Sequence, residues 1–141
     1  MAMKMIRNEE GYTTVLFCFV ILVMLAMAGL IIDSGMLMIA KMQLDDATEI
    51  AVESAVLQSY DLDRYNLDGT YDLIDSEVEA KTYEYLNKNM EDVLVTGMFF
   101  HPTKLNEVTV TTQVEIKTHF MMIFGKDKNT IKSEIRVFLH D

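Results

Sequence analysis

The side chains best suited to chemistry lie in an acidic stretch, residues 60–75 (YDLDRYNLDGTYDLID). The run Asp61-Leu62-Asp63 begins as an EF-hand calcium loop does, with oxygen ligands at alternate positions. However, Tyr65 stands at the third ligand position, and Asn66 stands where that loop requires glycine. The pattern favours a plain acidic turn, with a loose calcium or cation site as the alternative.

Other residue types used in catalysis or metal binding are few and scattered. The histidines His101, His119 and His140 share no ligand spacing, and the single cysteine, Cys18, lies in an apolar stretch where a thiol acts as a small hydrophobe. The chain has no glycine-rich phosphate loop, no Gly-x-Ser-x-Gly and no His-Glu-x-x-His. We expect no enzyme, catalytic residue, metal or cofactor, with catalysis or lipid modification at Cys18 as a minor alternative.

Charge is distributed unevenly along the 141 residues. The chain has 12 basic and 22 acidic side chains, a net charge of −10, and residues 41–100 alone hold four basic and fourteen acidic ones. Because no basic tract could neutralise phosphates, the composition disfavours nucleic-acid binding.

The first third of the chain contains a stretch long enough to cross a membrane. No charged residue occurs between Glu10 and Asp33, and residues 15–32 (VLFCFVILVMLAMAGLII) are almost entirely apolar. Since about 20 apolar residues span a bilayer core, we predict a transmembrane helix over residues 13–35, after a leader-like segment 1–12. The alternative is a signal peptide cleaved at Ala26-Met27-Ala28.

The flanking charges predict the orientation of this helix. Lys4 and Arg7 precede it, whereas Lys41 is the only basic residue from position 34 to position 63. The positive-inside rule therefore places residues 1–12 in the cytoplasm and an exterior domain, residues 36–141, outside the cytoplasmic membrane.

Beyond the span, the helix is predicted to continue to about Tyr60, because Gly35 is the only helix breaker. Apolar, mostly small residues recur at helical spacing and should pack on other elements: Leu37, Ala40, Leu44, Ala47, Ala51 and Ala55. The acidic residues Asp45, Glu49 and Glu53 form a row on another face, which is either solvated or meets a basic partner.

The remaining sequence predicts a second helix and a sheet. Ser76 and Glu79 have the spacing of a capping box and should open a helix over residues 77–90. Residues 93–100 are β-prone, and residues 108–120 and 131–139 alternate between apolar and polar types, which predicts a three-stranded antiparallel meander. Residues 120–124 (FMMIF) are too apolar for an exposed hairpin end, and belong either to the core or to a docking surface. The fold class is α+β.

An ordered pattern over residues 7–57 resembles the TadE/TadG-like proteins, which are pilin-like membrane components of tight-adherence (Flp) pilus systems. The pattern consists of RNEEG at 7–11, the apolar span, GLIIDSG at 29–35, and AKMQLDDA at 40–47 followed by small residues to Ala55. The resemblance implies a minor pilin or assembly factor of a pilus or secretion apparatus, which remains anchored or enters a pilus. Its partners would be the lipid bilayer and other pilin-like or membrane subunits, including copies of itself.

The resemblance also implies particular site residues. In the family a peptidase cleaves after a glycine, which would make Gly11 the last leader residue and Tyr12 the new N-terminus. A glutamate usually follows at the fifth mature position, where this chain has Leu16, so we expect inefficient cleavage or none.

Asp33 closes the span between Gly29 and Gly35, and these three residues are candidate intramembrane or interface contacts. The Asp33 carboxylate is expected either to reach headgroup water or to pair with a cationic group of a neighbouring subunit. A second functional reading of the chain is an anchored binding or sensor module that uses the acidic loop.

Overall fold

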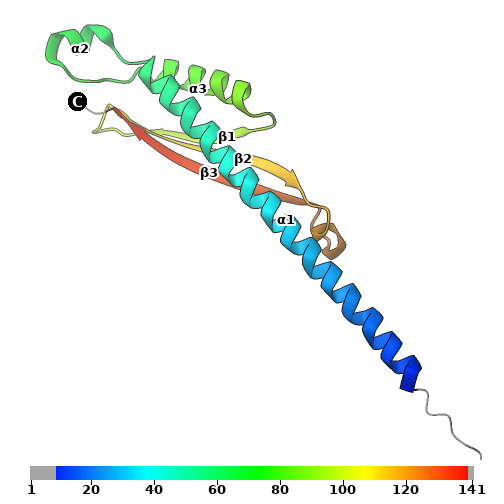
Figure 1. The fold of residues 1–141 in the computed structure, drawn as a ribbon. Coiled ribbons are helices and arrows are strands. Elements are labelled where there is room, and N and C mark those ends of the chain that lie inside the picture. The colour runs from blue at the N-terminus through cyan, green and yellow to red at the C-terminus, as the bar shows by residue number, and fades with distance from the viewer. Residues whose placement is uncertain (1–8, 140–141) are drawn as a thin grey trace, which may run out of the picture.

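The computed structural model describes residues 9–139 and shows one helix running through the whole molecule (Figure 1). This helix, α1, extends over Glu9–Leu57 and has no interruption at Gly11, Gly29 or Gly35. It is followed by α2 (Leu62–Asp68), α3 (Asp75–Asn89), the strands β1 (Leu94–Phe100) and β2 (Glu107–Lys117), the short 3-10 helix η1 (Met121–Phe124) and β3 (Lys128–Phe138). The α+β class is confirmed, with a long N-terminal apolar helix.

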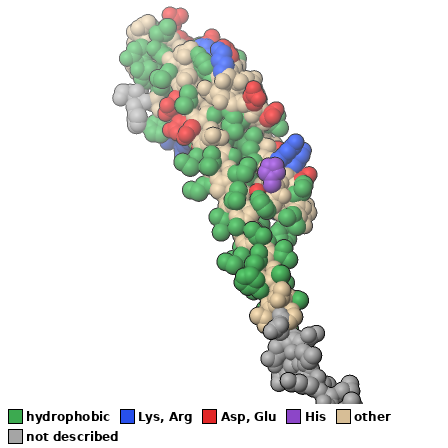
Figure 2. Space-filling view, turned by 45° about the vertical axis from the view of Figure 1, so that its right-hand side comes forward, with side chains coloured by type: hydrophobic (Ala, Val, Ile, Leu, Met, Phe, Trp, Pro, Cys, Tyr) green, Lys and Arg blue, Asp and Glu red, His purple; other side chains and the backbone are tan. Residues whose placement is uncertain are grey.

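The two halves of α1 have different surroundings. Residues 11–28 are exposed on every side, although they are almost all apolar, and the helix is long and apolar enough to cross a membrane. Figure 2 shows the same division, because hydrophobic side chains cover the narrow end of the molecule while charged side chains gather on the broad end. A helix that is apolar all round and has no protein around it matches a membrane span.

The three strands form the predicted antiparallel meander in the order β1-β2-β3. β2 and β3 pair without a break from Glu107↔Phe138 to Lys117↔Lys128. β1 pairs with β2 from Leu94↔Gln113 to Phe100↔Val108, with an irregularity between Val95 and Gly97. Both predicted alternating runs are therefore strands, but the first, predicted over residues 108–120, ends at Lys117.

Helices α1 and α3 cover one face of this sheet. α1 packs against β2, β3 and α3, and α3 also contacts β1. The core between these layers is formed by buried aliphatic side chains, namely Val52, Ala55, Val56, Leu73, Val78, Val108 and Val110. The predicted small-residue stripe lies at this contact: Ala40, Leu44, Ala47, Ala51 and Ala55 are buried, and Leu37 is half-buried.

Polar groups also join α1 to the sheet. The Thr48 hydroxyl donates to the Leu44 carbonyl at 2.7 Å and lies 2.8 Å from the Thr112 hydroxyl of β2, with both threonines fully buried. Asp45 accepts hydrogen bonds from Ser133 of β3 and from Lys41. The acidic row is therefore not uniformly solvated, since Asp45 belongs to the contact between helix and sheet while Glu49 and Glu53 are exposed.

Two local predictions differ from the structure. The predicted loop over residues 60–75 contains α2, which begins where the Asp61 carboxylate accepts hydrogen bonds from the backbone N–H groups of Asp63 and Arg64 and ends at Gly69 in the left-handed conformation. Residues 9–139 therefore contain one more α-helix than expected. The predicted capping box does not form, because α3 starts at Asp75, before Ser76, and its N-cap residue, Ile74, has no capping side chain.

Glu107, at the start of β2, is a buried carboxylate held by cations. Burial raises the pKa of Glu107, but the hydrogen bond from Arg136 Nε at 2.7 Å and the charges of Arg136 and Lys104 lower it by more. The pKa of Glu107 in the folded protein therefore lies below its ordinary value of 4.5. Since the unfolded chain binds the proton more readily, this contribution to stability is present above pH 4.5 and is lost as the pH falls through the lowered pKa.

We therefore expect the folded protein in detergent to lose resistance to urea as the pH falls below 4.5. Glu107→Gln should be less stable at neutral pH and should show a shallower loss in acid. Urea titrations followed by circular dichroism at several pH values measure both effects. An unchanged pH dependence in Glu107→Gln would show that other carboxylates cause the acid sensitivity.

Candidate functional site

The most distinctive polar contact lies where the apolar half of α1 ends, at Asp33. Its side chain is fully buried, and its two carboxylate oxygens accept hydrogen bonds from three successive backbone N–H groups. The distances are 3.2 Å from His119 N to Oδ1, 2.8 Å from Phe120 N to Oδ2 and 2.7 Å from Met121 N to Oδ2. Asp33 therefore fixes the segment after β2 to the end of the apolar half of α1.

Gly29 lies one helical turn before Asp33 and makes room for the same segment. A Cβ atom at this position would lie 2.1 Å from Cδ1 of Phe120, so only glycine allows the phenyl ring to rest directly on the helix backbone. The third residue of the candidate set, Gly35, has no atom within 4 Å of such a Cβ. Gly29 and Asp33 thus contact residues 119–121, whereas Gly35 does not take part.

These contacts explain why β2 ends early. Once the amides of residues 119–121 bind Asp33, they cannot pair with a neighbouring strand, and the chain turns through η1 to Gly125 in the left-handed conformation. In Figure 1, η1 lies beside α1, below the sheet and toward the N-terminal half of the helix. Within the apolar run of residues 120–124, Phe120 and Met121 are half-buried and the last three residues are exposed.

The candidate cleavage site lies in an exposed part of a regular helix. Gly11 and Tyr12 lie within α1 and are exposed, and nothing lies within 4 Å of a Cβ placed on Gly11. Most of the leader-like segment, residues 1–8, with the predicted cytoplasmic charges Lys4 and Arg7, lies outside the described residues.

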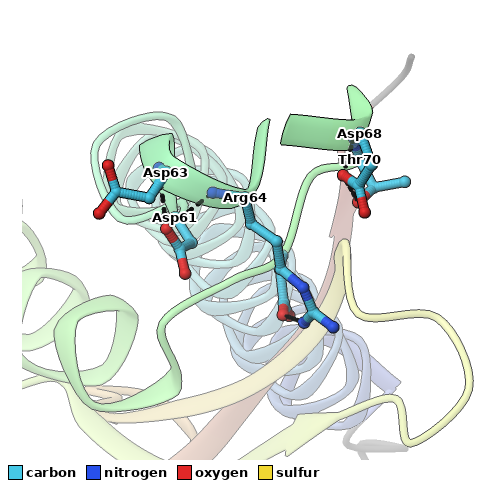
Figure 3. A network of polar contacts seen from close by, with 6 residues as sticks. Asp61, Asp63, Arg64, Asp68 and Thr70 are labelled. Carbon is cyan, nitrogen blue, oxygen red and sulfur yellow. Dashed lines mark hydrogen bonds and ion pairs between the residues drawn. The ribbon is translucent and has the colours of Figure 1, made fainter. Parts of the chain in front are cut away.

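Three carboxylates of the acidic loop, those of Asp61, Asp68 and Asp72, bind groups of the chain itself, and Figure 3 shows part of this network. Asp61 caps α2, and Asp68 accepts from the backbone N–H of Thr70 at 3.0 Å and from its hydroxyl at 2.5 Å. Arg64 pairs with Asp72, beside a cluster of the rings of Tyr60, Tyr65 and Tyr71. Among residues 9–139 no three His, Cys, Asp or Glu side chains gather as a metal site would require. These contacts stabilise the loop itself.

The single cysteine, Cys18, lies exposed in the apolar half of α1.

The fold by itself indicates a structural class of protein. A long apolar N-terminal helix that continues as the cover of an antiparallel sheet is the architecture of a pilin-like α+β protein. Comparison with known families agrees, because residues 11–56 match the model of the Flp pilus-assembly TadE/G-like family. The resemblance predicted from the sequence is thus confirmed.

The family match covers the span and the stripe but none of the strands, since it ends inside α1. It implies a component related to pilus assembly, in a family not known for enzymes. No curated protein and no solved structure matches the chain.

Asp33→Asn tests the contact between α1 and residues 119–121. Asparagine has a single carbonyl oxygen for the three N–H donors, and its own NH₂ group would face them, so the segment should detach from the helix. We expect hydrogen exchange at the amides of residues 119–121 to accelerate on the order of tenfold or more, given the strength of hydrogen bonds to charged groups. The control is Asp46→Asn, an exposed position of the same helix. Equal exchange in both variants would contradict the proposed role of the carboxylate.

Proposed function

We propose that this protein is a membrane-anchored structural component, a minor pilin or assembly factor, of a tight-adherence-like pilus or secretion apparatus. Residues 13–35 cross the cytoplasmic membrane, residues 1–12 face the cytoplasm, and residues 36–141 form the exterior domain. The supporting observation is the continuity of α1, since the helix whose residues 11–56 match the family model is both the candidate span and the cover of the sheet.

A continuous helix suits a structural role. Because α1 has no break between the apolar half and the sheet, a force or a docking event at the exterior domain is transmitted directly to the membrane segment. The family match suggests contact with other pilus subunits, and we propose pilin-like or membrane assembly subunits as partners, with self-association as a further option.

The experiment that tests this function uses the tagged full-length protein in its native host. Purification from detergent-solubilised membranes should recover at least one pilin-like or membrane assembly subunit, and deletion of the gene should reduce pilus output. The variant Leu44→Asp, which disrupts the helix–sheet contact, serves as a matched control and should recover neither partner nor function. Normal pili in the deletion strain, together with no subunit recovered, would contradict the proposal.

We also propose that cleavage after Gly11 is inefficient, because Leu16 stands where the family usually has glutamate. The exposed helical position of Gly11 and Tyr12 leaves the peptide bond reachable only if α1 unwinds locally. Intact mass spectrometry of protein from the native host should therefore show mainly uncleaved chains. Complete conversion to chains that begin at Tyr12 would refute this expectation.

A further inference from the structure

The 3-10 helix η1 presents three large apolar side chains to the surroundings. The exposed fractions are 59% for Met122, 73% for Ile123 and 67% for Phe124. Soluble protein surfaces rarely gather such residues without a partner. These three side chains, which form the apolar apex of η1, therefore require an apolar surface that covers them.

The position of η1 along α1 indicates what that surface is. Phe120 rests on Gly29 and the amides of residues 119–121 bind Asp33, so η1 lies level with the last turns of the apolar stretch. At this level α1 itself exposes Ile31 and Ile32. If the apolar half of α1 is in lipid, η1 is at the depth of the outer interface, level with exposed apolar residues of the helix.

The backbone of this segment is suited to a membrane environment. The N–H groups of residues 119–121 bind the Asp33 carboxylate, and those of Ile123, Gly125 and Lys126 bind the carbonyls of Phe120, Met122 and Met121. The hydrocarbon region offers no water to polar backbone groups, so a segment that lies beside it is favoured when the protein itself supplies their partners. Asp33 supplies the acceptors for three of these N–H groups.

Basic side chains flank the apolar apex on the side of the sheet. Lys117 and Lys126 are exposed on either side of the segment, and Lys128 follows with an ion pair to Glu115. Lysines next to an inserted apolar segment extend toward lipid phosphates and add attraction to anionic headgroups.

We propose that η1 is a second membrane contact, in which Met122, Ile123 and Phe124 insert into the outer interfacial region of the same bilayer that α1 crosses. The inference rests on the proposed membrane anchoring. Two contacts, one spanning and one interfacial, fix the tilt and rotation of the exterior domain relative to the membrane, which a single helix leaves free. The lipid bilayer is the chosen occupant because η1 is held at the level of Gly29 and Asp33, where the candidate span exposes Ile31 and Ile32.

The test places a polarity-sensitive fluorophore on single cysteines of the full-length protein, in a Cys18→Ser background. Ile123→Cys reports on η1. Leu25→Cys, 62% exposed in the apolar half of α1, is the lipid control, and Leu67→Cys, 86% exposed in α2 at the far end of the domain, is the water control. The proteins are reconstituted in phosphatidylethanolamine–phosphatidylglycerol vesicles that contain lipids with spin labels at shallow or deep positions along the acyl chain.

We expect the fluorophore at position 123 to emit at short wavelength and to be quenched by the shallow spin label, that at position 25 to be quenched by the deep label, and that at position 67 to be quenched by neither. Quenching at position 25 without quenching at position 123 would overturn the inference while leaving the anchor intact. Short-wavelength emission at position 123 without lipid quenching would point to a protein partner instead and would also overturn it. Absence of quenching at position 25 would refute the anchoring itself.

Discussion

Leu44→Asp is expected to unfold the α+β domain in which α1 and α3 cover the sheet. Leu44 is fully buried where α1 meets the sheet, and Asp at this position would place an unpaired charge among apolar side chains. Loss of the leucine packing alone costs about 2–5 kcal/mol, and the buried charge adds to it. Since a domain of this size is stable by only about 5–15 kcal/mol, most of the cooperative transition should disappear. Thermal and urea unfolding followed by circular dichroism in detergent measures the loss.

Met42→Asp is the matched control for this variant. Met42 lies two residues away on the same helix and is exposed, so the same change of charge should alter the free energy of unfolding by less than about 1 kcal/mol. Similar destabilisation by the two variants would mean that the buried face of α1 is not the contact that holds the domain together.

Arginine substitutions in the middle of the apolar half of α1 should prevent stable membrane integration. Leu22 and Leu25 are both exposed there, and an arginine at the centre of a span costs at least about 2.5–3.5 kcal/mol on insertion scales. Leu22→Arg alone should reduce membrane integration only in part, because the remaining apolar residues of the helix offset some of the cost of one arginine. The double variant Leu22→Arg/Leu25→Arg should be extracted from membranes by alkaline carbonate.

Leu22→Phe/Leu25→Phe is the control for the double arginine variant, since it changes size and shape at the same positions without adding charge. It should remain in the carbonate-resistant fraction, as the unchanged protein does. Full retention of the double arginine variant in that fraction would show that residues 13–35 do not span the bilayer.

The elements with strong periodic or compositional signals could be predicted from the sequence. The uncharged stretch before Asp33 predicted the exposed apolar half of α1, and the alternating runs predicted the strands of the meander. The spacing of Ala40, Leu44, Ala47, Ala51 and Ala55 matched the buried face of the helix, because a stripe with a period close to 3.6 can face only one side.

The local capping contacts were harder to predict. α2 is only seven residues long and contains Asp and Asn, which are typical of turns. Its N-cap at Asp61 and its C-cap at Gly69 were therefore evident only from the backbone geometry. The start of α3 before Ser76 likewise follows from its backbone and not from the capping-box spacing.

The contact between Asp33 and residues 119–121 carries no local signal at all. Its partners are more than 80 positions apart and bind through backbone N–H groups, which every non-proline residue has. The apolar run at residues 120–124 indicated either a core segment or a docking surface. Gly29 and Asp33 stood out separately, as candidate contacts at the end of the predicted span. Only the fold brings these features together.

Membrane topology is the most direct test of an anchored protein with an exterior domain. A reporter enzyme that is active only outside the cytoplasm, fused after Asp141 of the full-length chain, should be active in intact cells. A matched fusion after Arg7, before the apolar stretch, should be inactive. Activity of a cytoplasm-dependent reporter after Asp141, with none from the exterior reporter, would contradict an exterior domain carried on α1.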